Sequence, residues 1–101
     1  MEVKIEGRQV EIGDELRDRI QKQFDNLDQR FGPLTHGRIS VERKAHNNEQ
    51  RAMVKVVVNV AGKTISATKE AATVLAAVNE TLDTLTDELL DHAEKSKKSH
   101  R

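Results

Sequence analysis

Apolar residues alternate with polar ones along four stretches of the chain. The alternation is clearest from Ala52 to Val60, where every second residue is Ala or Val. A period of two is typical of strands with one buried face. We therefore expect strands at residues 2–7, 38–44, 52–60 and 65–67, with a polar loop at residues 44–51 and a turn at Ala61-Gly62.

Two other stretches place apolar residues three or four positions apart, which is the spacing of one helix face. The first is opened by Gly13-Asp14-Glu15 and closed by Gly32-Pro33. The second is expected to be a helix of about 25 residues with Thr68 as its N-cap. The apolar residues are Leu16, Ile20, Phe24, Leu27 and Phe31 in the first helix, and Ala71, Leu75, Val78, Leu82, Leu85 and Leu89 in the second.

The order β-α-β-β-β-α predicts an α+β two-layer sandwich, with both helices on the apolar face of a four-stranded sheet. We expect a single domain at residues 1–94 and a flexible basic tail at residues 95–101. The other sheet face would meet solvent. It would carry Lys4, Arg38, Lys44, Lys55, Asn59 and Ser66.

Composition excludes several functions. The 101 residues contain no cysteine, so a disulfide framework, a thiolate nucleophile and a cysteine-based zinc site are impossible. His36, His46, His92 and His100 lack the spacing of metal ligands, and no phosphate loop or nucleophile elbow is present. No apolar run has the length of a membrane span. We expect a cytosolic, non-enzymatic protein without cofactor or metal.

The charges cancel in total but are separated along the chain. Residues 36–68 carry six basic and two acidic side chains, whereas residues 69–94 carry one basic and seven acidic side chains. The basic side chains of the predicted open sheet face, Arg38, Lys44 and Lys55, favour contact with nucleic-acid phosphates. Phe24 and Phe31 are the only aromatic residues, and both belong to the first helix. Base stacking is therefore excluded, which leaves backbone and shape recognition of structured RNA.

The second helix allows more than one interpretation. Its leucine spacing fits core packing or the seam of a coiled-coil dimer. The acidic row Glu80, Asp83, Asp87, Asp91 and Glu94 is expected on its solvent side. That row is either a solvated face or a docking surface for a basic partner. A straight exposed row gives no enclosing geometry for a metal ion.

Several segments, in order, are similar to the ribosome hibernation promoting factor family, also called sigma-54 modulation protein or ribosome-associated inhibitor. They are 5-IEGRQVEIGDELRDRI-20, 42-ERKAH-46, 52-AMVKVVV-58, Gly62 with 65-ISA-67, and 75-LAAVNETLDTL-85. The resemblance covers almost the whole chain. It implies a fold like that of a double-stranded-RNA-binding domain and a short-form member without the dimerisation domain of longer relatives.

The resemblance also implies a function. Family members bind the small ribosomal subunit between head and body, block the mRNA and tRNA path and silence ribosomes in stationary phase or stress. Five rRNA-binding residues are carried over from the family's motifs: Arg17, Arg43, His46, His92 and Lys95. Six others are expected from their charge and placement: Lys22, Arg38, Lys44, Lys55, Lys97 and Lys98. We expect a monomer away from the ribosome.

The chain departs from the family on its helices. Thr84, Asp87 and Asp91 stand where the family has Lys or Arg, and Gln23 and Asn26 stand at lysine positions. Much of the family's basic helical surface is thus missing. The alternative is a protein-interaction module, either a homodimer through the second helix or a divergent paralogue that does not bind ribosomes.

Overall fold

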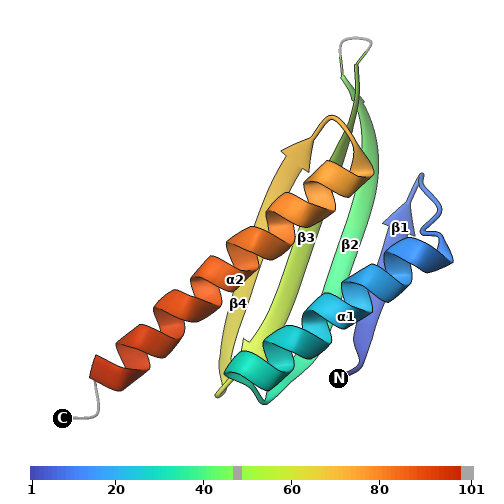
Figure 1. Cartoon of the computed structure of the whole chain (residues 1–101). Helices are drawn as coiled ribbons and strands as arrows, with labels where there is room; N and C mark the ends of the chain where they lie inside the picture. The colour runs from blue at the N-terminus through green and yellow to red at the C-terminus, as the bar shows by residue number, and fades with distance from the viewer. Residues whose placement is uncertain (47–48, 99–101) are drawn as a thin grey trace.

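The computed structural model describes residues 1–46 and 49–98, with only the backbone for His46 and residues 96–98. The elements follow the predicted order β-α-β-β-β-α (Figure 1). They are β1 (Val3–Arg8), α1 (Asp14–Phe31), β2 (Leu34–His46), β3 (Glu49–Val60), β4 (Lys63–Ala71) and α2 (Val74–Lys98).

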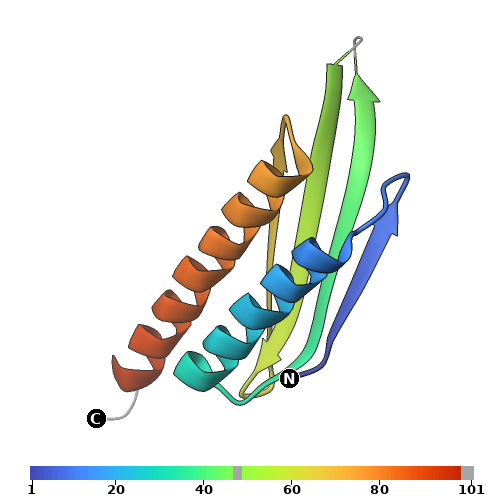
Figure 2. The ribbon, with the colours of Figure 1, turned by 45° about the vertical axis from the view of Figure 1, so that its right-hand side comes forward.

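The four strands form one sheet in the order β1-β2-β3-β4. Strand β1 is parallel to β2, and the other neighbours are antiparallel. Both helices cover the same face of this sheet, and the opposite face is bare (Figures 1 and 2). The predicted α+β two-layer sandwich is therefore confirmed. The Ala61-Gly62 turn is also confirmed, since both residues have the positive φ of a tight hairpin turn.

The core lies between the sheet and the helices. Every second residue of β3 from Ala52 to Val60 is buried, as the alternation predicts. The predicted apolar face of α1 is buried at Ile20, Phe24 and Leu27. Leu82, Leu85 and Leu89 of α2 are buried against the same core, so the leucine spacing reflects core packing. Neither described helix is both long and apolar enough to cross a membrane.

The polar loop expected at residues 44–51 is wrong. Most of these residues extend β2 and β3, which pair as far as His46 opposite Glu49. Strand β1 ends opposite Glu42, and β4 ends opposite Ala52. Residues 43–46 and 49–51 therefore project beyond the rest of the sheet as a two-stranded hairpin arm (Figure 1). The hydrophobic pattern missed this arm because neither of its faces is buried.

The predicted start of the second helix is also wrong. Thr68 lies in β4 opposite Lys55, and Ala71 ends that strand. Helix α2 begins at Val74. Thr73 caps it, because its hydroxyl oxygen accepts a hydrogen bond from the Ala76 N–H at 3.2 Å. The helix continues to Lys98, so residues 95–98 of the expected tail are helical, while residues 99–101 lie outside the described residues.

The end of α1 depends on a tight approach between Gly32 and Asp28. The Asp28 carbonyl oxygen accepts the Gly32 N–H at 2.8 Å, and its carboxylate accepts the Leu34 N–H at 2.8 Å. A Cβ atom added to Gly32 would overlap that carbonyl oxygen. The turn into β2 therefore requires glycine for space.

Gly32→Ala is expected to lower the free energy of unfolding by about 1–3 kcal/mol, because overpacking displaces the backbone. Gly13→Ala is the matched control, since an added Cβ there meets no atom within 4 Å. Its effect should stay below about 1 kcal/mol. Urea denaturation measures both changes. Equal losses for the two variants would contradict the steric explanation.

Candidate nucleic-acid interface

The face of the sheet that the helices leave bare carries alternating side chains from all four strands. We call it the open sheet face. Period-two geometry places Lys4, Arg8, Arg38, Lys44, Arg51 and Lys55 there, beside the acidic Glu6, Glu42 and Glu70. The predicted basic residues Arg38, Lys44 and Lys55 are all exposed on this face, as expected from the sequence.

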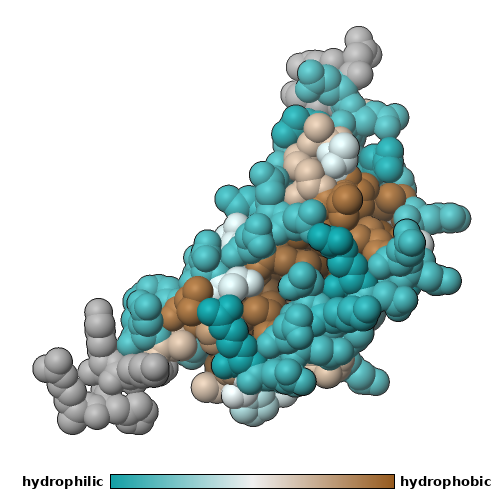
Figure 3. All heavy atoms as spheres, in the orientation of Figure 1, coloured by the Kyte–Doolittle hydropathy of each residue, from teal (hydrophilic) through white to brown (hydrophobic). Residues whose placement is uncertain are grey.

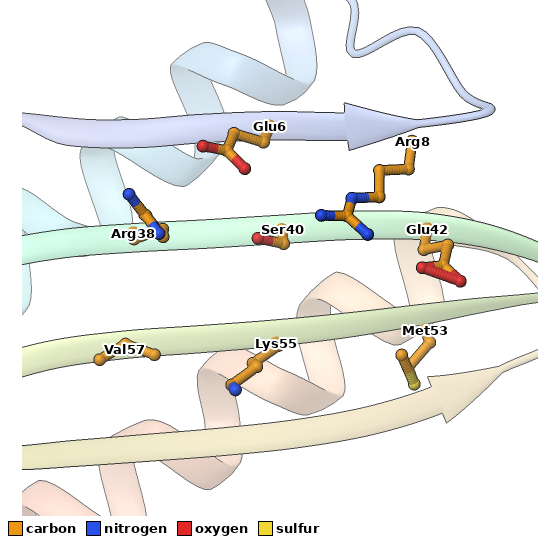
Figure 4. A pocket seen from close by; sticks show the side chains of 8 residues that line it. All are labelled: Glu6, Arg8, Arg38, Ser40, Glu42, Met53, Lys55 and Val57. Atoms are coloured by element: carbon orange, nitrogen blue, oxygen red, sulfur yellow. The ribbon is translucent and has the colours of Figure 1, made fainter.

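The centre of the open sheet face is a shallow hollow of about 330 Å³, which we call the sheet hollow. Its lining comes from three adjacent strands, β1, β2 and β3 (Figure 4). Arg8 reaches from β1 across β2, and its guanidinium lies near Ser40 and Glu42 in this view. The lining residues are Glu6, Arg8, Arg38, Ser40, Glu42, Met53, Lys55 and Val57.

Ion pairs on the open sheet face divide its cations into two groups. Lys4 pairs with Glu6 at 3.5 Å, Lys44 with Glu42 at 3.9 Å, and Arg51 with Glu70 at 3.2 Å. Within residues 1–46 and 49–98, no ion pair engages a second group, namely Arg8, Arg38 and Lys55. The face therefore has three uncompensated positive charges around the sheet hollow.

The hairpin arm extends this basic surface. Lys44 and Arg51 lie opposite each other in register and share the side of the open sheet face. Arg43 has the opposite orientation. It donates a hydrogen bond to Gln50 at 3.1 Å and lines a groove with Val74 and Leu75. His46 has a described backbone in β2, and its side chain lies outside the description.

The basic residues predicted on the helices lie in the other layer. Arg17 donates a hydrogen bond from Nε to the Ile12 carbonyl oxygen at 3.1 Å, which fastens the segment before α1. Lys22 is exposed on α1. Near the end of α2, His92 is half-buried, and Lys95 pairs with Asp91 at 3.0 Å. The side chains of Lys97 and Lys98 are not described. The eleven predicted residues thus do not converge on one surface.

The helical layer differs from the sheet face in charge. Hydrophilic side chains cover the outer sides of both helices, with apolar residues visible between them (Figure 3). The predicted acidic row of α2 is confirmed as solvent-exposed along its whole length, from Glu80 to Glu94. Lys95 is the one cation that pairs with this row in the described part of the chain.

Sequence reasoning missed Arg8, which lines the sheet hollow. The expected first strand stopped at Gly7, whereas β1 includes Arg8. Its signal was present in the sequence, because Arg8 continues the alternation of Lys4 and Glu6. Arg51 was recognised as basic but not placed in the site, since the arm that carries it was expected to be a loop.

Comparisons with known proteins identify relatives. The chain is 31% identical over 87 residues to a ribosome hibernation promotion factor from Deinococcus radiodurans, covering 85% of this chain and 46% of that protein. It is 27% identical over 95 residues to a ribosome hibernation promoting factor from Azotobacter vinelandii, covering 94% of this chain and 85% of that protein. The chain thus spans about half the length of the first relative.

Solved structures share the fold. A ribosomal subunit interface protein from Coxiella burnetii matches with a TM-score of 0.73 at 21% identity, covering 93% of this chain and 99% of that one. The N-terminal domain of Protein Y from Thermus thermophilus matches with a TM-score of 0.64 at 27% identity, covering 88% and 96%.

A family model described as Sigma 54 modulation protein / S30EA ribosomal protein matches residues 3–97, which include every helix and strand except the last residue of α2. This family was expected from the order of the sequence motifs. With its fold and its relatives in agreement, the chain belongs to the Sigma 54 modulation protein / S30EA ribosomal protein family.

Proposed function

We propose that this domain is a ribosome-associated translation inhibitor of the cytoplasm. It binds the small ribosomal subunit through rRNA phosphates and blocks the path of mRNA and tRNA in stationary phase or stress. Two relatives are named ribosome hibernation factors, and a structural relative is a ribosomal subunit interface protein, which supports this proposal. The family is one of ribosome-associated proteins that are not enzymes.

The charge difference between the two layers is the observation that favours RNA binding through the sheet. The open sheet face has uncompensated cations at Arg8, Arg38 and Lys55, whereas α2 exposes its acidic row. Phosphates attract the first surface and repel the second. The open sheet face and the hairpin arm therefore face rRNA in our proposal, and α2 faces away from it.

The expected rRNA contacts follow from this orientation. Arg8, Arg38, Lys44 and Lys55 would form charge-assisted hydrogen bonds with phosphate oxygens. Arg43 and His46 would contribute from the hairpin arm. The helical residues Arg17, Lys22, His92, Lys95, Lys97 and Lys98 remain predicted contacts, with smaller contributions than those of the open sheet face.

Co-sedimentation with isolated small subunits across a salt series tests this function. Counterion release predicts that log K falls with log salt, with a slope of about −0.7 to −0.9 for each phosphate contacted. Four contacts from the open sheet face would give a slope of about −3 to −4. Failure to co-sediment even at about 50 mM salt would overturn the proposed function.

A second candidate is a protein-interaction module, which the groove at the N-terminal ends of the helices favours. This groove, of about 680 Å³, is lined in part by Val10, Leu16, Val74 and Leu75, and Leu75 is 51% exposed. Burial of the α2 leucines in the core removes the coiled-coil seam, so a homodimer would have to use this groove. Light scattering that shows only monomers at working concentration would exclude the homodimer.

A further inference from the structure

We infer that the sheet hollow is a discrete binding site for one nucleoside phosphate unit, with a cationic part for the phosphate and an apolar part for the sugar or base. The cationic part takes one residue from each of three adjacent strands: Arg8 from β1, Arg38 from β2 and Lys55 from β3. Ser40 lies between them on β2, directly opposite Lys55 in register. An anion above Ser40 could therefore be approached from three directions (Figure 4).

The carboxylates of the sheet hollow do not cancel this positive charge. Glu6 is paired with Lys4 at 3.5 Å, and Glu42 with Lys44 at 3.9 Å. Both lysines lie outside the lining, so each carboxylate is partly neutralised from outside the hollow. Arg8, Arg38 and Lys55 keep their donors available for an incoming ligand. Guanidinium groups match phosphate oxygens with paired donors, and lysine adds a point charge.

The rest of the lining distinguishes a nucleoside phosphate from a bare anion. Met53 and Val57 flank Lys55 on β3 and are half-buried on a face that is otherwise polar. Methionine packs adaptably against flat ligand groups. The oxygens of Glu6 and Glu42 can accept hydrogen bonds from sugar hydroxyls, including the 2′-hydroxyl that marks RNA. A volume of about 330 Å³ is at the small end of ligand sites, which suits a single nucleotide.

This inference rests on the proposed function in one respect, because an rRNA strand is the expected source of the nucleotide. A free nucleotide presents the same phosphate, sugar and base. The chemistry recognised is shared by both sources, and only binding measurements with both kinds of probe separate them.

NMR titration of ¹⁵N-labelled protein tests the site with three probes: inorganic phosphate, adenosine 5′-monophosphate and the tetranucleotide rA4. The nucleotide probes should perturb the amides of residues 38–40 and 53–57 with saturation, and more tightly than inorganic phosphate. Arg38→Glu should weaken nucleotide binding at least about tenfold through loss of a charge-assisted hydrogen bond and added repulsion. Met53→Ala should weaken the nucleotides but not inorganic phosphate.

Lys69→Glu is the matched control. It makes the same charge change on β4, at an exposed position on the helical side of the sheet. Saturation by adenosine 5′-monophosphate identifies free nucleotides as a source, and saturation by rA4 alone identifies an RNA strand. Either result supports the site. Absence of perturbation at the sheet hollow with every probe at low salt, or equal losses in Arg38→Glu and Lys69→Glu, would overturn it.

Ribosome co-sedimentation on the same samples separates this inference from the proposed function. Nucleotide binding in the sheet hollow without ribosome binding would overturn the proposed function alone. Ribosome binding without nucleotide binding in the sheet hollow would overturn the inferred site alone. Circular dichroism confirms that each variant is folded before either assay.

Discussion

Reversing two charges on the open sheet face, with Arg38→Glu and Lys55→Glu, is expected to abolish co-sedimentation with small subunits at physiological salt. Both residues are exposed and free of ion pairs with described residues, so each is available to a phosphate. Charge-assisted hydrogen bonds contribute about 1.5–3 kcal/mol each, so affinity should fall on the order of a hundredfold or more. The slope of log K against log salt should become shallower by about one per lost contact.

A double reversal on the helical layer controls for net charge. Arg30→Glu and Lys69→Glu change the charge of the protein by the same amount, and both residues are exposed away from the open sheet face. Long-range repulsion alone would weaken both double variants similarly. Equal losses would contradict a specific role of the sheet face, whereas near-retention of binding by the control supports it.

Phe24→Ala is expected to lower the free energy of unfolding by about 3–5 kcal/mol, because it removes a large buried ring and leaves a cavity. Phe24 is fully buried, and the chain has no aromatic residue apart from Phe31 to replace it. Domains of this size are stable by about 5–15 kcal/mol, so the variant would be marginal.

Phe31→Ala is the matched comparison for this stability change. Phe31 is only half-buried, at the last position of α1, where the Arg30 guanidinium lies 4.9 Å from the ring centroid. Urea denaturation should give it a clearly smaller loss than Phe24→Ala. A loss below about 1 kcal/mol for Phe24→Ala would show that the core does not depend on this ring.

The fold could be predicted where one face of an element is buried. Alternation from Ala52 to Val60 placed the central strand, and apolar spacing from Leu16 to Phe31 placed α1. The hairpin arm escaped prediction because its strands have no buried face, so backbone hydrogen bonds alone define it. Thr68 was an acceptable cap by residue type, but pairing with β3 extended β4 beyond it.

The candidate site was predictable only in part. Exposure of Arg38, Lys44 and Lys55 on one face follows from period two alone. Which cations remain free does not, because it depends on neighbours across strands: Arg51 pairs with Glu70, 19 residues away in sequence. The acidic row of α2 was also visible in the sequence, while its separation from the basic residues required the three-dimensional arrangement of two layers.

The orientation of the domain on the small subunit tests the central claim most directly, and electron cryomicroscopy of the complex would measure it. We predict that the open sheet face and the hairpin arm lie against rRNA, with Arg8, Arg38 and Lys55 within hydrogen-bond reach of phosphates and the acidic row of α2 turned away. A complex in which the helices contact rRNA and the open sheet face meets solvent would contradict the account.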